Sequence, residues 1–533
     1  MKIYNSADLG LKKDSDITRE LIDFFSSIKD IKEDKKLIIQ EGTYYIDSDN
    51  ADLHELFITN TCHEKEWTKP SMVNKYKSAI YMENIENLEI FADNVTLMLN
   101  GKLNNIVIKN CKNIKIKGLV IDNISPDLHM IEVVEKKGFS ITYKVDNASK
   151  IVEKNNKLYF EGKDYFSDVE RDKYSAHYIG KIEHNDKNNI RRVAHPFLAS
   201  RKIQKVSDRE IKVSYIFPKN YQIGDKFFLY EVHRVNNGIV ITDSENITIE
   251  KVTQHFNYGL AFVAQMSKNI LVDGVNFEPK NDDMLMASLA DFMQVCMCSE
   301  DIIIKNSRFV GAGDDALNVH GIHLKVVEKY DNKLKLAFSH KQTYGFNIYE
   351  IGDIVAFINP KSLEEYGRAK VLNSRLLDTH TIELTLDNVD KISEGMVLEN
   401  ITKCPRLTYE NNFLSRIITR GLLISTRGKS IVKNNYFDNT TMHAILCSND
   451  AKSWYESGRV EDLTIENNTF NVCKMHLLDI LPENAGYKNK VHKNISFINN
   501  KVLQEKASIR VKNCENFVEK NNKTEKPIKL IKK

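Results

Sequence analysis

Residues 246–272 read N-I-T-I-E-K-V-T-Q-H-F-N-Y-G-L-A-F-V-A-Q-M-S-K-N-I-L-V, and they contain one short unit twice. An asparagine is followed by alternating apolar and polar residues in Asn246-Ile-Thr-Ile249, and the unit returns 23 residues later as Asn269-Ile-Leu-Val272. Alternation with a period of two is typical of a β-strand, and asparagine tolerates the left-handed backbone of a tight turn. This stretch therefore predicts one strand per coil of a repetitive fold.

The same unit recurs along most of the chain. Many copies are followed by a second short strand that again begins at asparagine, as in Asn306-Ser-Arg-Phe309 and Asn467-Asn-Thr-Phe470. The copies lack long apolar stripes at helical spacing, which excludes a helical solenoid, whereas repeats of roughly 20–50 residues are typical of solenoids in general. The sequence therefore predicts an all-β fold, a right-handed parallel β-helix. Further copies are Asn87-Leu-Glu-Ile90, Asn113-Ile-Lys-Ile116, Asp301-Ile-Ile-Ile304, Ser430-Ile-Val432, Asp462-Leu-Thr-Ile465, Asn494-Ile-Ser-Phe497 and Asn516-Phe-Val518.

Two stretches without the asparagine repeat interrupt the predicted helix. Each contains the pattern Tyr-x-Ile-Gly-Asp directly before an apolar strand, at Tyr221–Asp225 and Tyr349–Asp353. A Gly-Asp turn before an apolar strand is typical of a hairpin, so we expect two inserted, small antiparallel β-barrel-like modules. At the start, Asp14-Ser15-Asp16 precedes an apolar stripe that predicts an N-terminal cap helix. The predicted segments are 1–126 (cap and first coils), 127–235 (module 1), 236–321 (coils with the acidic residues), 322–400 (module 2) and 401–533 (C-terminal coils).

The overall composition excludes several classes of partner. The chain has 533 residues, 28% of them charged, with a formal net charge of +3. This balance gives no reason to expect nucleic acid or an anionic membrane surface, and no apolar run reaches the roughly 18 residues that span a bilayer. The start, Met1–Asp8, lacks the apolar segment of a secretory signal, so we expect a cytoplasmic protein, or a secreted one if a leader was removed. Exposed inserted modules are candidate contacts for a homodimer.

The eight cysteines do not predict a metal site. Cys296-x-Cys298 is a single close pair without the second pair that a zinc site needs. We interpret the cysteines as small buried hydrophobic residues, and we expect neither a metal nor another cofactor.

A short segment near the middle of the chain concentrates acidic residues. Asp291 stands alone, and Asp314 and Asp315 form a pair that Gly311 and Gly313 introduce. Carboxylates this close repel each other unless a cation binds or they share a proton, and core packing gives no reason for them. Asp314 follows Asp291 by 23 residues, the length of one coil, so we expect the two on neighbouring rungs about 4.8 Å apart.

Carboxyl groups on neighbouring rungs suit glycoside hydrolysis. A small lateral offset would give the separation of about 6.5–9.5 Å that inverting enzymes use, and direct stacking would approach the roughly 5–5.5 Å of retaining enzymes. The spacing therefore leaves the stereochemistry open. In the inverting arrangement, one residue of the pair Asp314/Asp315 activates water, its mate orients the water, and Asp291 protonates the leaving oxygen.

Other polar and aromatic residues are candidates for binding a sugar. Those that follow the acidic pair alternate along one predicted strand and therefore share a face, and others flank a strand one coil earlier. Two downstream segments, 419–427 and 447–458, carry more arginine, acidic and aromatic residues than a structural turn needs. A tryptophan beside a glutamate on a long loop is typical of a sugar-stacking platform. The candidates are Asn257, Tyr258, Gln265, Gln294, Asn318, His320, Arg420, Arg427, Asp450, Trp454 and Glu456.

Several of these motifs also carry a family resemblance. They are G-D-D-A-L-N-V-H-G at 313–321, Ala290-Asp-Phe upstream of it, R-G-L-L-I-S-T-R at 420–427, W-Y-E-S-G at 454–458, and Leu56-Phe-Ile-Thr-Asn-Thr61. Taken together they resemble glycoside hydrolase family 110, the α-1,3-galactosidases. The resemblance extends over nearly the whole chain, including both inserted modules.

The resemblance implies an exo-acting, inverting α-galactosidase that needs no metal. Its substrate would be a glycan that ends in α-1,3-linked galactose, of the blood group B type or the linear Galα1,3Gal type. By the family pattern, Asp291 matches the acid, and Asp314 and Asp315 match the pair that serves as base. Many family members act outside the cell, so the missing signal is a departure from the pattern. The pattern also places these side chains in the galactose pocket: His320, Arg427, Trp454 and Glu456.

Three other functions would use a β-helix. A polygalacturonase-like hydrolase is expected to have a Gly-His-Gly turn and an Arg-x-Lys for the uronate, whereas this chain has Asn-Val-His-Gly321, and Arg510-Val-Lys512 lies in the last coils. A pectate lyase needs calcium, which takes more oxygen ligands than the acidic segment supplies. A glycan-binding protein without enzymatic activity needs no paired acids.

Overall fold

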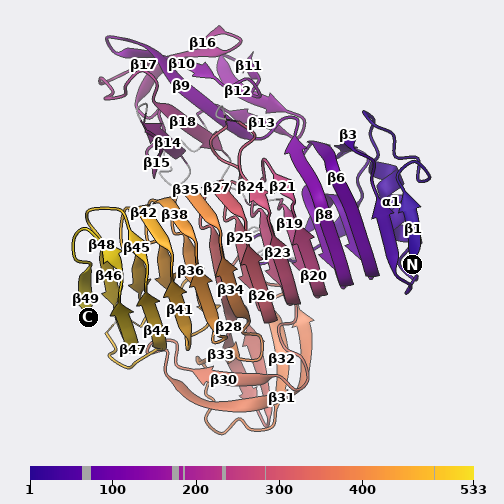
Figure 1. Ribbon diagram of the computed structural model, residues 1–533, viewed down its shortest axis with the longest axis vertical. Helices are drawn as coiled ribbons and strands as arrows, with labels where there is room; N and C mark the ends of the chain where they lie inside the picture. Colours follow the sequence, from indigo (N-terminus) through magenta and orange to yellow (C-terminus); the bar gives the residue numbers. More distant parts are fainter. Residues whose placement is uncertain are drawn as a thin grey trace.

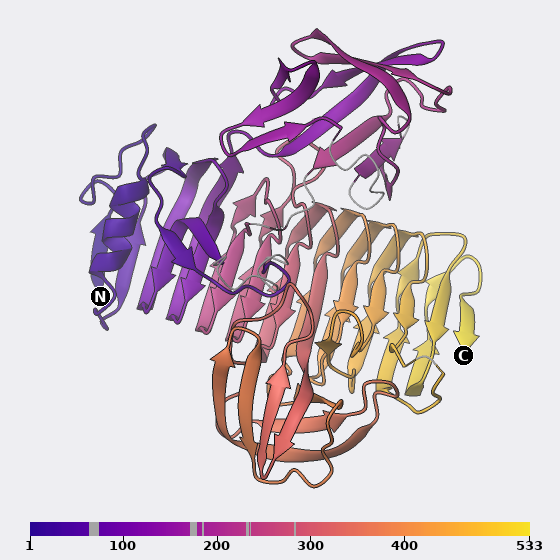
Figure 2. The same ribbon diagram turned by 180° about the vertical axis from the view of Figure 1, so that it is seen from behind.

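The protein is a long parallel β-helix with one module projecting from each of two opposite edges (Figure 1; Figure 2). The structure is a computed structural model, and it describes residues 1–62, 74–170, 179–183, 186–230, 234, 236–281, 284–484 and 486–532. Helix α1 (Thr18–Ser27) covers the N-terminal end of the coil stack, with Leu21, Phe24 and Phe25 buried against it. The predicted all-β class, the parallel β-helix, the two insertions and the cap helix are confirmed.

Three parallel ladders of strands form the faces of the coil stack, because each coil contributes up to one strand to each face. The first face contains β1 (Lys2–Asn5), β2 (Lys35–Ile38), β6 (Glu86–Asn100), β8 (Lys112–Asn123), β20 (Glu245–Glu250), β23 (Lys268–Asp273), β26 (Ser299–Lys305), β34 (Arg406–Glu410), β37 (Ser430–Lys433), β41 (Leu463–Glu466), β44 (His492–Ile498) and β47 (Cys514–Lys520).

The second face shares the long strands β6 and β8 with the first, and the third face carries the acidic segment. The second contains β3 (Gly42–Asp47), β21 (Thr253–Gln254), β24 (Asn276–Phe277), β27 (Arg308–Ala312), β35 (Phe413–Ile417), β38 (Tyr436–Thr440), β42 (Thr469–Cys473), β45 (Lys501–Val502) and β48 (Lys523–Thr524). The third contains β5 (Lys75–Glu83), with β4 (Leu53–Glu55) antiparallel to it, β7 (Asn104–Lys109), β19 (Ile239–Thr242), β22 (Phe262–Gln265), β25 (Met293–Cys296), β28 (Leu317–Tyr330), β36 (Leu422–Ile424), β39 (Ile445–Cys447), β43 (Leu478–Ile480), β46 (Ser508–Val511) and β49 (Lys529–Lys532).

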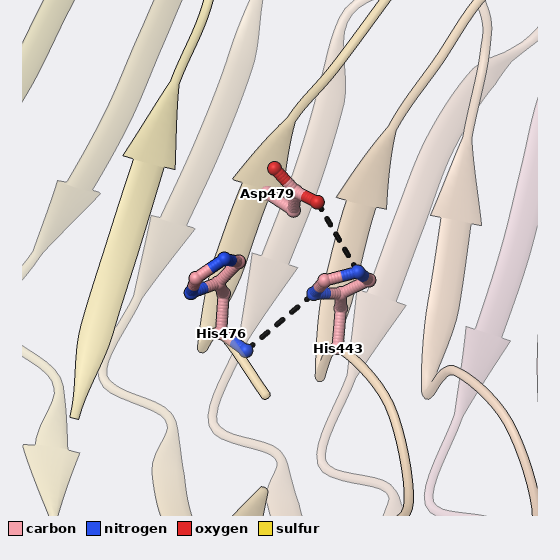
Figure 3. A group of neighbouring side chains, drawn as sticks. All are labelled: His443, His476 and Asp479. Carbon is pink, nitrogen blue, oxygen red and sulfur yellow. Dashed lines mark hydrogen bonds and ion pairs between the residues drawn. The ribbon is translucent and has the colours of Figure 1, made fainter. Parts of the chain in front are cut away.

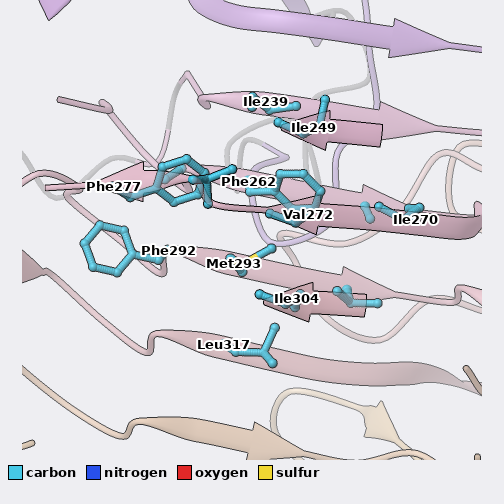
Figure 4. Packing of buried hydrophobic residues seen from close by; sticks show 14 of the residues in the cluster. Ile239, Ile249, Phe262, Ile270, Val272, Phe277, Phe292, Met293, Ile304 and Leu317 are labelled. Atoms are coloured by element: carbon cyan, nitrogen blue, oxygen red, sulfur yellow. The ribbon is translucent and has the colours of Figure 1, made fainter. Parts of the chain in front are cut away.

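The core lies inside the coils, where alternate residues of every strand meet (Figure 4). Ile249, Val272 and Ile304 follow one another on successive rungs of the first face, and each is fully buried. Burying one such side chain contributes roughly 1.5–3 kcal/mol, so stacking identical positions stabilises every rung against its neighbours.

Asparagine side chains line the turns as predicted. Asn246 donates to Asn113 at 2.9 Å, Asn269 donates to Asn246 at 3.1 Å, and all three have φ between 55° and 57°. The left-handed turn conformation expected of these asparagines is therefore confirmed, and their side chains form a hydrogen-bonded ladder from coil to coil.

The two inserted modules differ in how they close. Module 1 is a seven-stranded antiparallel sheet in the order β15-β14-β18-β9-β10-β17-β16, next to a three-stranded sheet of β11, β12 and β13. In module 2, β28 pairs with β29 and β33, and the ring is completed through β32, β31 and β30, so the strands close into a barrel. Module 1 comprises β9 (Leu128–Lys137), β10 (Ser140–Val145), β11 (Ile151–Lys154), β12 (Lys157–Gly162), β13 (Tyr165–Asp168), β14 (Ile179–Glu183), β15 (Asp186–Arg192), β16 (Ser200–Ser207), β17 (Glu210–Tyr215) and β18 (Lys226–Tyr230); module 2 adds β29 (Lys333–Ala337), β30 (Ile354–Ile358), β31 (Glu365–Asp378), β32 (Thr381–Leu386) and β33 (Val397–Asn400) to the outer part of β28.

Strand β28 connects the coil stack to module 2. Its first residues pair in parallel with β25 and β36 on the third face, and its last residues pair with β29 and β33 in the barrel. Between these parts, Gly321 and Ile322 pair with the short strand β40 (Glu456–Ser457). Within the part of the chain that the structure describes, no helix has the length and apolar character to cross a membrane.

Candidate active site

Three acidic side chains meet at the edge of the third face. Asp291 precedes β25 by two residues, and Asp314 and Asp315 lie between β27 and β28. One oxygen from each carboxyl group lies within 4.8 Å of the other two. This is shorter than the roughly 6.5–9.5 Å of most inverting pairs, so the separation by itself does not decide the stereochemistry.

The alignment of these acids corrects the expectation by one residue. Met293 pairs with Leu317, so this coil advances by 24 residues, and Asp291 lies beside Asp315 rather than Asp314. The backbone N–H of Asp315 donates to Asp291 Oδ1 at 3.2 Å. Ser288 and Ala312 form an isolated bridge with the same offset of 24 residues, so the offset is already present before the turn that carries Asp314 and Asp315.

Glycine is required in that turn. A Cβ on Gly313 would lie 2.4 Å from the carbonyl oxygen of Leu289, and Gly311 has φ of +85°. The turn can therefore pass close to the neighbouring rung, which brings the acidic pair next to Asp291.

Two arginines bind the acidic pair. Arg420 binds both carboxylate oxygens of Asp315: its Nε donates to Oδ1 and an NH2 group donates to Oδ2, both at 2.8 Å. The Thr419 hydroxyl also donates to Oδ1, at 2.5 Å. Arg234 contacts Asp314 Oδ2 at 2.7 Å. A paired fork of this kind holds a carboxylate in one orientation, so Asp315 is fixed on both oxygens. Asp314 Oδ1 is held less closely, since Arg420 and Arg192 both lie 3.9 Å from it.

The three carboxyl groups have different proton affinities. Burial, together with the charge of Asp314, raises the pKa of Asp291 well above its ordinary value. Burial also acts to raise the pKa of Asp314, but the guanidinium groups of Arg234, Arg420 and Arg192 outweigh it and lower this pKa. Burial raises the pKa of Asp315 even though Arg420 opposes it. In the free protein the proton of the cluster therefore belongs on Asp291, while Asp314 is ionised.

Glu456 lines the same pocket as the three acids. Asn318 Nδ2 donates to both of its carboxylate oxygens, at 3.2 and 3.3 Å, and Asn60 Nδ2 donates to Oε1 at 3.3 Å. His320 Nε2 lies 3.6 Å from the same oxygen. The buried Asn318 Oδ1 has no hydrogen-bond partner among the described residues, so a polar acceptor remains for a ligand.

His320 is positively charged at neutral pH. Burial opposes the charge, but the Glu456 carboxylate raises the pKa of His320 to about 10. Its Nδ1 donates to the carbonyl of Gly321 at 2.8 Å, and its Nε2 faces the amide of Gln294 at 2.9 Å. The amide oxygen of Gln294 is otherwise unpartnered and is the atom that fits opposite a charged Nε2–H.

A loop between β39 and β40 supplies an aromatic wall. The carboxylate of Asp450 accepts the backbone N–H groups of Lys452, Ser453 and Trp454, which gives the loop its shape. Trp454 is 45% exposed, and its ring lies 4.5 Å from that of His340 in module 2. A half-exposed indole above a polar pocket is suited to pack against the C–H face of a sugar.

Two adjoining cavities result from this arrangement. The first, called the acid pocket, has a volume of about 330 Å³, and the second, called the side pocket, has about 660 Å³. The acid pocket is lined by Asn60, Arg234, Asp291, Asp314, Asp315, Asn318, Arg420, Leu423, Trp454 and Glu456. The side pocket is lined by Arg420, Leu423, Ser425, Leu446, Ser448, Asn449, Asp450, Ser453, Trp454, Glu456 and Glu483.

Most of the predicted site residues come together around these cavities. Asn318, Arg420, Trp454 and Glu456 line the acid pocket beside the three acids, and Asp450 lines the side pocket. His320 and Gln294 lie directly behind this wall, through the contacts with Glu456 and with each other.

Four predicted residues do not reach the cavities, because their polar groups serve the fold. Asn257 donates to the carbonyl of Ala287, and Tyr258 donates to the carbonyl of Ser125. Gln265 binds the backbone of the segment 56–62 through Thr59 N and Phe57 O.

Arg427, expected in the galactose pocket, is the fourth of these residues. Its guanidinium binds Glu399 at 2.6 and 3.0 Å, Glu365 at 2.9 Å and Glu461 at 3.0 Å. Only 8% of the side chain is exposed. Arg427 thus joins module 2 to the coil stack.

Sequence reasoning missed Arg234, Arg192 and the role of Asn60. Both arginines come from or follow module 1, outside the repeat, so no periodicity connects them with the acids. Asn60 lies in the segment 56–61, which carried part of the family resemblance, and that was the only signal for it.

Two groups of described residues bring potential metal ligands together. One is the acidic trio, and the other is His443, His476 and Asp479 on the third face (Figure 3). In the second group, Asp479 accepts from His443 at 3.1 Å and is gripped by Arg510 at 2.7 and 2.5 Å. In the acidic trio, arginines bind Asp314 and Asp315 but not Asp291, and in the second group Arg510 binds Asp479, so three of the four carboxylates belong to ion-paired hydrogen-bond networks.

Comparisons with known proteins agree with the sequence resemblance. Residues 333–396, most of module 2, match the family model described as GLAA-B beta-barrel domain II. The chain is 32% identical over 492 residues to Alpha-1,3-galactosidase A of Bacteroides thetaiotaomicron, covering 90% of this chain and 84% of that protein. It is 27% identical over 497 residues to Alpha-1,3-galactosidase B of Phocaeicola vulgatus, covering 88% and 80%.

Among solved structures, the chain is similar to the Family 28 exopolygalacturonase of Yersinia enterocolitica, with a TM-score of 0.41, 11% identity and coverage of 100% of this chain and 78% of that one. It is also similar to the polygalacturonase of Erwinia carotovora, with a TM-score of 0.39, 9% identity and coverage of 99% and 96%. The 32% identity over 90% of this chain and 84% of the Bacteroides thetaiotaomicron protein shows the family. This chain belongs to glycoside hydrolase family 110, the α-1,3-galactosidases.

Proposed function

We propose that this protein hydrolyses the terminal α-1,3-linked galactose of a glycan, with the galactose bound in the acid pocket. The observation that carries the proposal is the group of three carboxyls in that pocket, one with a raised pKa and one with a lowered pKa. Paired groups with opposite shifts are suited to act as acid and base at the same pH. The relatives' names supply the sugar and the linkage.

The roles follow from the contacts of each carboxyl. Asp291 has no cation in ion-pair contact among the described residues, and it is the group that keeps a proton, so it donates this proton to the oxygen that leaves C1. Asp314 is ionised, and its Oδ1, which Arg192 and Arg420 approach only to 3.9 Å, takes a proton from water as the water oxygen attacks C1. Asp315 is held on both oxygens by Arg420, so it orients the water. The C1–O bond breaks, a C1–OH bond forms on the opposite face, and β-galactose is released.

The polygalacturonase-like alternative is less well supported. A uronate substrate needs a cation that is free to bind its carboxylate. The two arginines that line the acid pocket, Arg234 and Arg420, are already paired with Asp314 and Asp315. The pocket is therefore better suited to a neutral sugar.

A substrate screen tests the activity. We expect hydrolysis of α-1,3-linked galactosides, with branched blood group B trisaccharide and linear Galα1,3Gal as separate arms, and at least 100-fold slower hydrolysis of α-1,4- and α-1,6-linked galactosides. NMR of the first-formed sugar should show β-galactose. Equal rates on all linkages, or α-galactose as first product, would contradict the proposal.

The acid and base assignments are tested with variants and two leaving groups. Asp291→Asn should lose roughly 10²–10⁴-fold on Galα1,3Gal but much less on α-galactosyl fluoride, whose leaving group needs no proton. Asp314→Ala should lose activity on both substrates and be rescued by azide, with β-galactosyl azide as product. If Asp314→Ala still hydrolysed α-galactosyl fluoride and Asp291→Asn did not, Asp314 rather than Asp291 would be the general acid.

A further inference from the structure

The side pocket continues directly from the acid pocket along the coil axis. On the third face, Asn318 pairs with Leu423, and Leu423 pairs with Leu446, so these side chains form one column across three rungs. Asn318 and Leu423 line the acid pocket, and Leu423 and Leu446 line the side pocket. The column that begins at Asn318 in the acid pocket therefore provides an apolar floor one and two rungs further toward the C-terminus.

The rim of the side pocket is polar and contains an unused acceptor. Asn449 is only 1% exposed, and its Oδ1 has no hydrogen-bond partner among the described residues. A buried acceptor without a partner is costly unless a ligand or water binds it. An apolar floor with hydroxyl and amide groups around it is the usual composition of a sugar subsite.

Most of the charged residues around the side pocket are acidic. Its walls carry Glu456, Glu483 and Asp450, and hydrogen bonds from Ser453 and the neighbouring backbone outweigh burial and keep the pKa of Asp450 low. Arg420, the cation that lines this pocket, already donates from Nε and from an NH2 group to the two carboxylate oxygens of Asp315. His320 balances the charge of Glu456, so a carboxylate or sulfate brought into this pocket would meet the remaining negative charges of Asp450 and Glu483.

We propose that the side pocket is the subsite for the sugar to which the cleaved galactose is attached, and that it selects a neutral sugar over an anionic one. This inference rests on the proposed function, because it assumes that galactose occupies the acid pocket. The leaving sugar lies with its C–H face on Leu423 and Leu446 and donates a hydroxyl to Asn449 Oδ1. Glu483, at the exposed rim, supplies a further acceptor for hydroxyls and repels anionic groups.

Filling the side pocket tests its occupancy. Leu446→Trp should lower kcat/KM for Galα1,3Gal at least tenfold, while kcat/KM for α-galactosyl fluoride, which has no second sugar, should fall less than threefold. Leu503→Trp adds the same indole at a residue that is 41% exposed beyond β45, and it should change neither value. Equal losses on both substrates, or no loss on either, would overturn the assignment of the pocket.

The preference for a neutral sugar is tested with two acceptors. Wild-type enzyme should prefer Galα1,3Gal over the same disaccharide with galacturonic acid as the acceptor by at least tenfold at low salt, and Glu483→Gln should reduce this ratio at least threefold. The same ratio in both proteins, or a preference for the uronic acid, would overturn the charge argument. If wild-type enzyme hydrolyses neither α-galactosyl fluoride nor the disaccharide, the proposed function itself is wrong. If it hydrolyses both but shows no preference for the neutral sugar, only the subsite proposal is wrong.

Discussion

At the scale of single residues, the ionisation of Asp314 depends on arginines from a distant part of the chain. Arg234 contacts it at 2.7 Å, and Arg192 and Arg420 lie 3.9 Å away. Of the other two acids, Asp291 lies on the neighbouring rung and Asp315 is the next residue in the same turn. Without these cations, burial would raise the pKa of Asp314 instead of leaving it lowered. The arginines therefore determine the lowest pH at which the base is ionised.

Replacing Arg234 by Gln should shift the acid side of the pH–rate profile. Because the lowered pKa of Asp314 would rise, the acid limb of kcat/KM should move to higher pH by roughly 1–2 units. Activity at low pH is then lost, and activity well above the new pKa is largely kept. The measurement is kcat/KM for α-galactosyl fluoride between pH 4 and 9.

Arg191→Gln is the matched control for this shift. Arg191 neighbours Arg192 in β15, is 52% exposed and pairs with Glu183 instead of the acidic cluster. Its profile should match that of wild type. An acid limb that stays in place in Arg234→Gln would show that Arg234 does not control the base.

At the scale of elements, the side-chain ladders hold the coils in register. Asn468 is fully buried: its amide donates to Val432 O and Asn500 Oδ1, and its oxygen accepts from both nitrogens of Asn435. One side chain thus satisfies buried polar groups of three coils. Such groups cost about 1–3 kcal/mol each when they are left unpaired.

Asn468→Ala should therefore destabilise the C-terminal coils locally. We expect the free energy of local opening to fall by about 3 kcal/mol, since several buried groups lose their partner at once. Hydrogen exchange of the backbone amides in β37, β41 and β44 measures it. Asn471→Ala, in the same coil, removes one half-buried bond to Asp438 and should cost about 1 kcal/mol. Equal effects of the two variants would mean that the buried ladder adds nothing.

The elements were predictable from the sequence where local chemistry fixes them. The turn residues Asp225 and Asp353 of the repeated Tyr-x-Ile-Gly-Asp pattern both accept the backbone N–H three residues earlier, at 3.0 and 2.9 Å. Both precede a strand, β18 and β30. By contrast, the one-residue error in aligning Asp291 arose because coil length is not constant: it is 23 residues between β20 and β23 and 24 between β25 and β28. Periodicity alone does not contain that change.

At the scale of the whole molecule, the site lies where three parts of the chain meet. Module 1 contributes Arg192, and module 2 contributes His340 beside Trp454 and Thr343, which binds Asn60. The residues that these contacts join are between 114 (His340 and Trp454) and 283 (Asn60 and Thr343) positions apart in the sequence, and the contacts follow from the packing of the modules rather than from any repeat. The acids were predictable because they belong to the repeat, whereas their cationic partners and the pocket walls were not.

Arg427 offers a test of how module 2 depends on the coil stack. Its guanidinium neutralises Glu399 and Glu365 of module 2 and Glu461 of the coils. Removing one partner of a buried ion pair costs about 3–5 kcal/mol, because the remaining charges stay buried without compensation. Arg427→Met should therefore lower the thermal midpoint by several degrees, and Arg427→Lys should lower it less, since it keeps the charge but not the fork.

Kinetics of the same variants separate this structural role from a role in binding galactose. If Arg427 joins the module to the coils, the folded fraction of Arg427→Lys below its midpoint should keep the wild-type KM for α-galactosyl fluoride. If it binds galactose, as the family resemblance implied, KM should rise at an unchanged midpoint. Arg406→Met is the control, because Arg406 also pairs with two acids but is 51% exposed, and exposed pairs contribute about 0–1 kcal/mol. The structural role would be contradicted if Arg427→Met lowered the thermal midpoint no more than Arg406→Met does. The acidic partners of Arg427 are costly to leave unpaired only because they are buried.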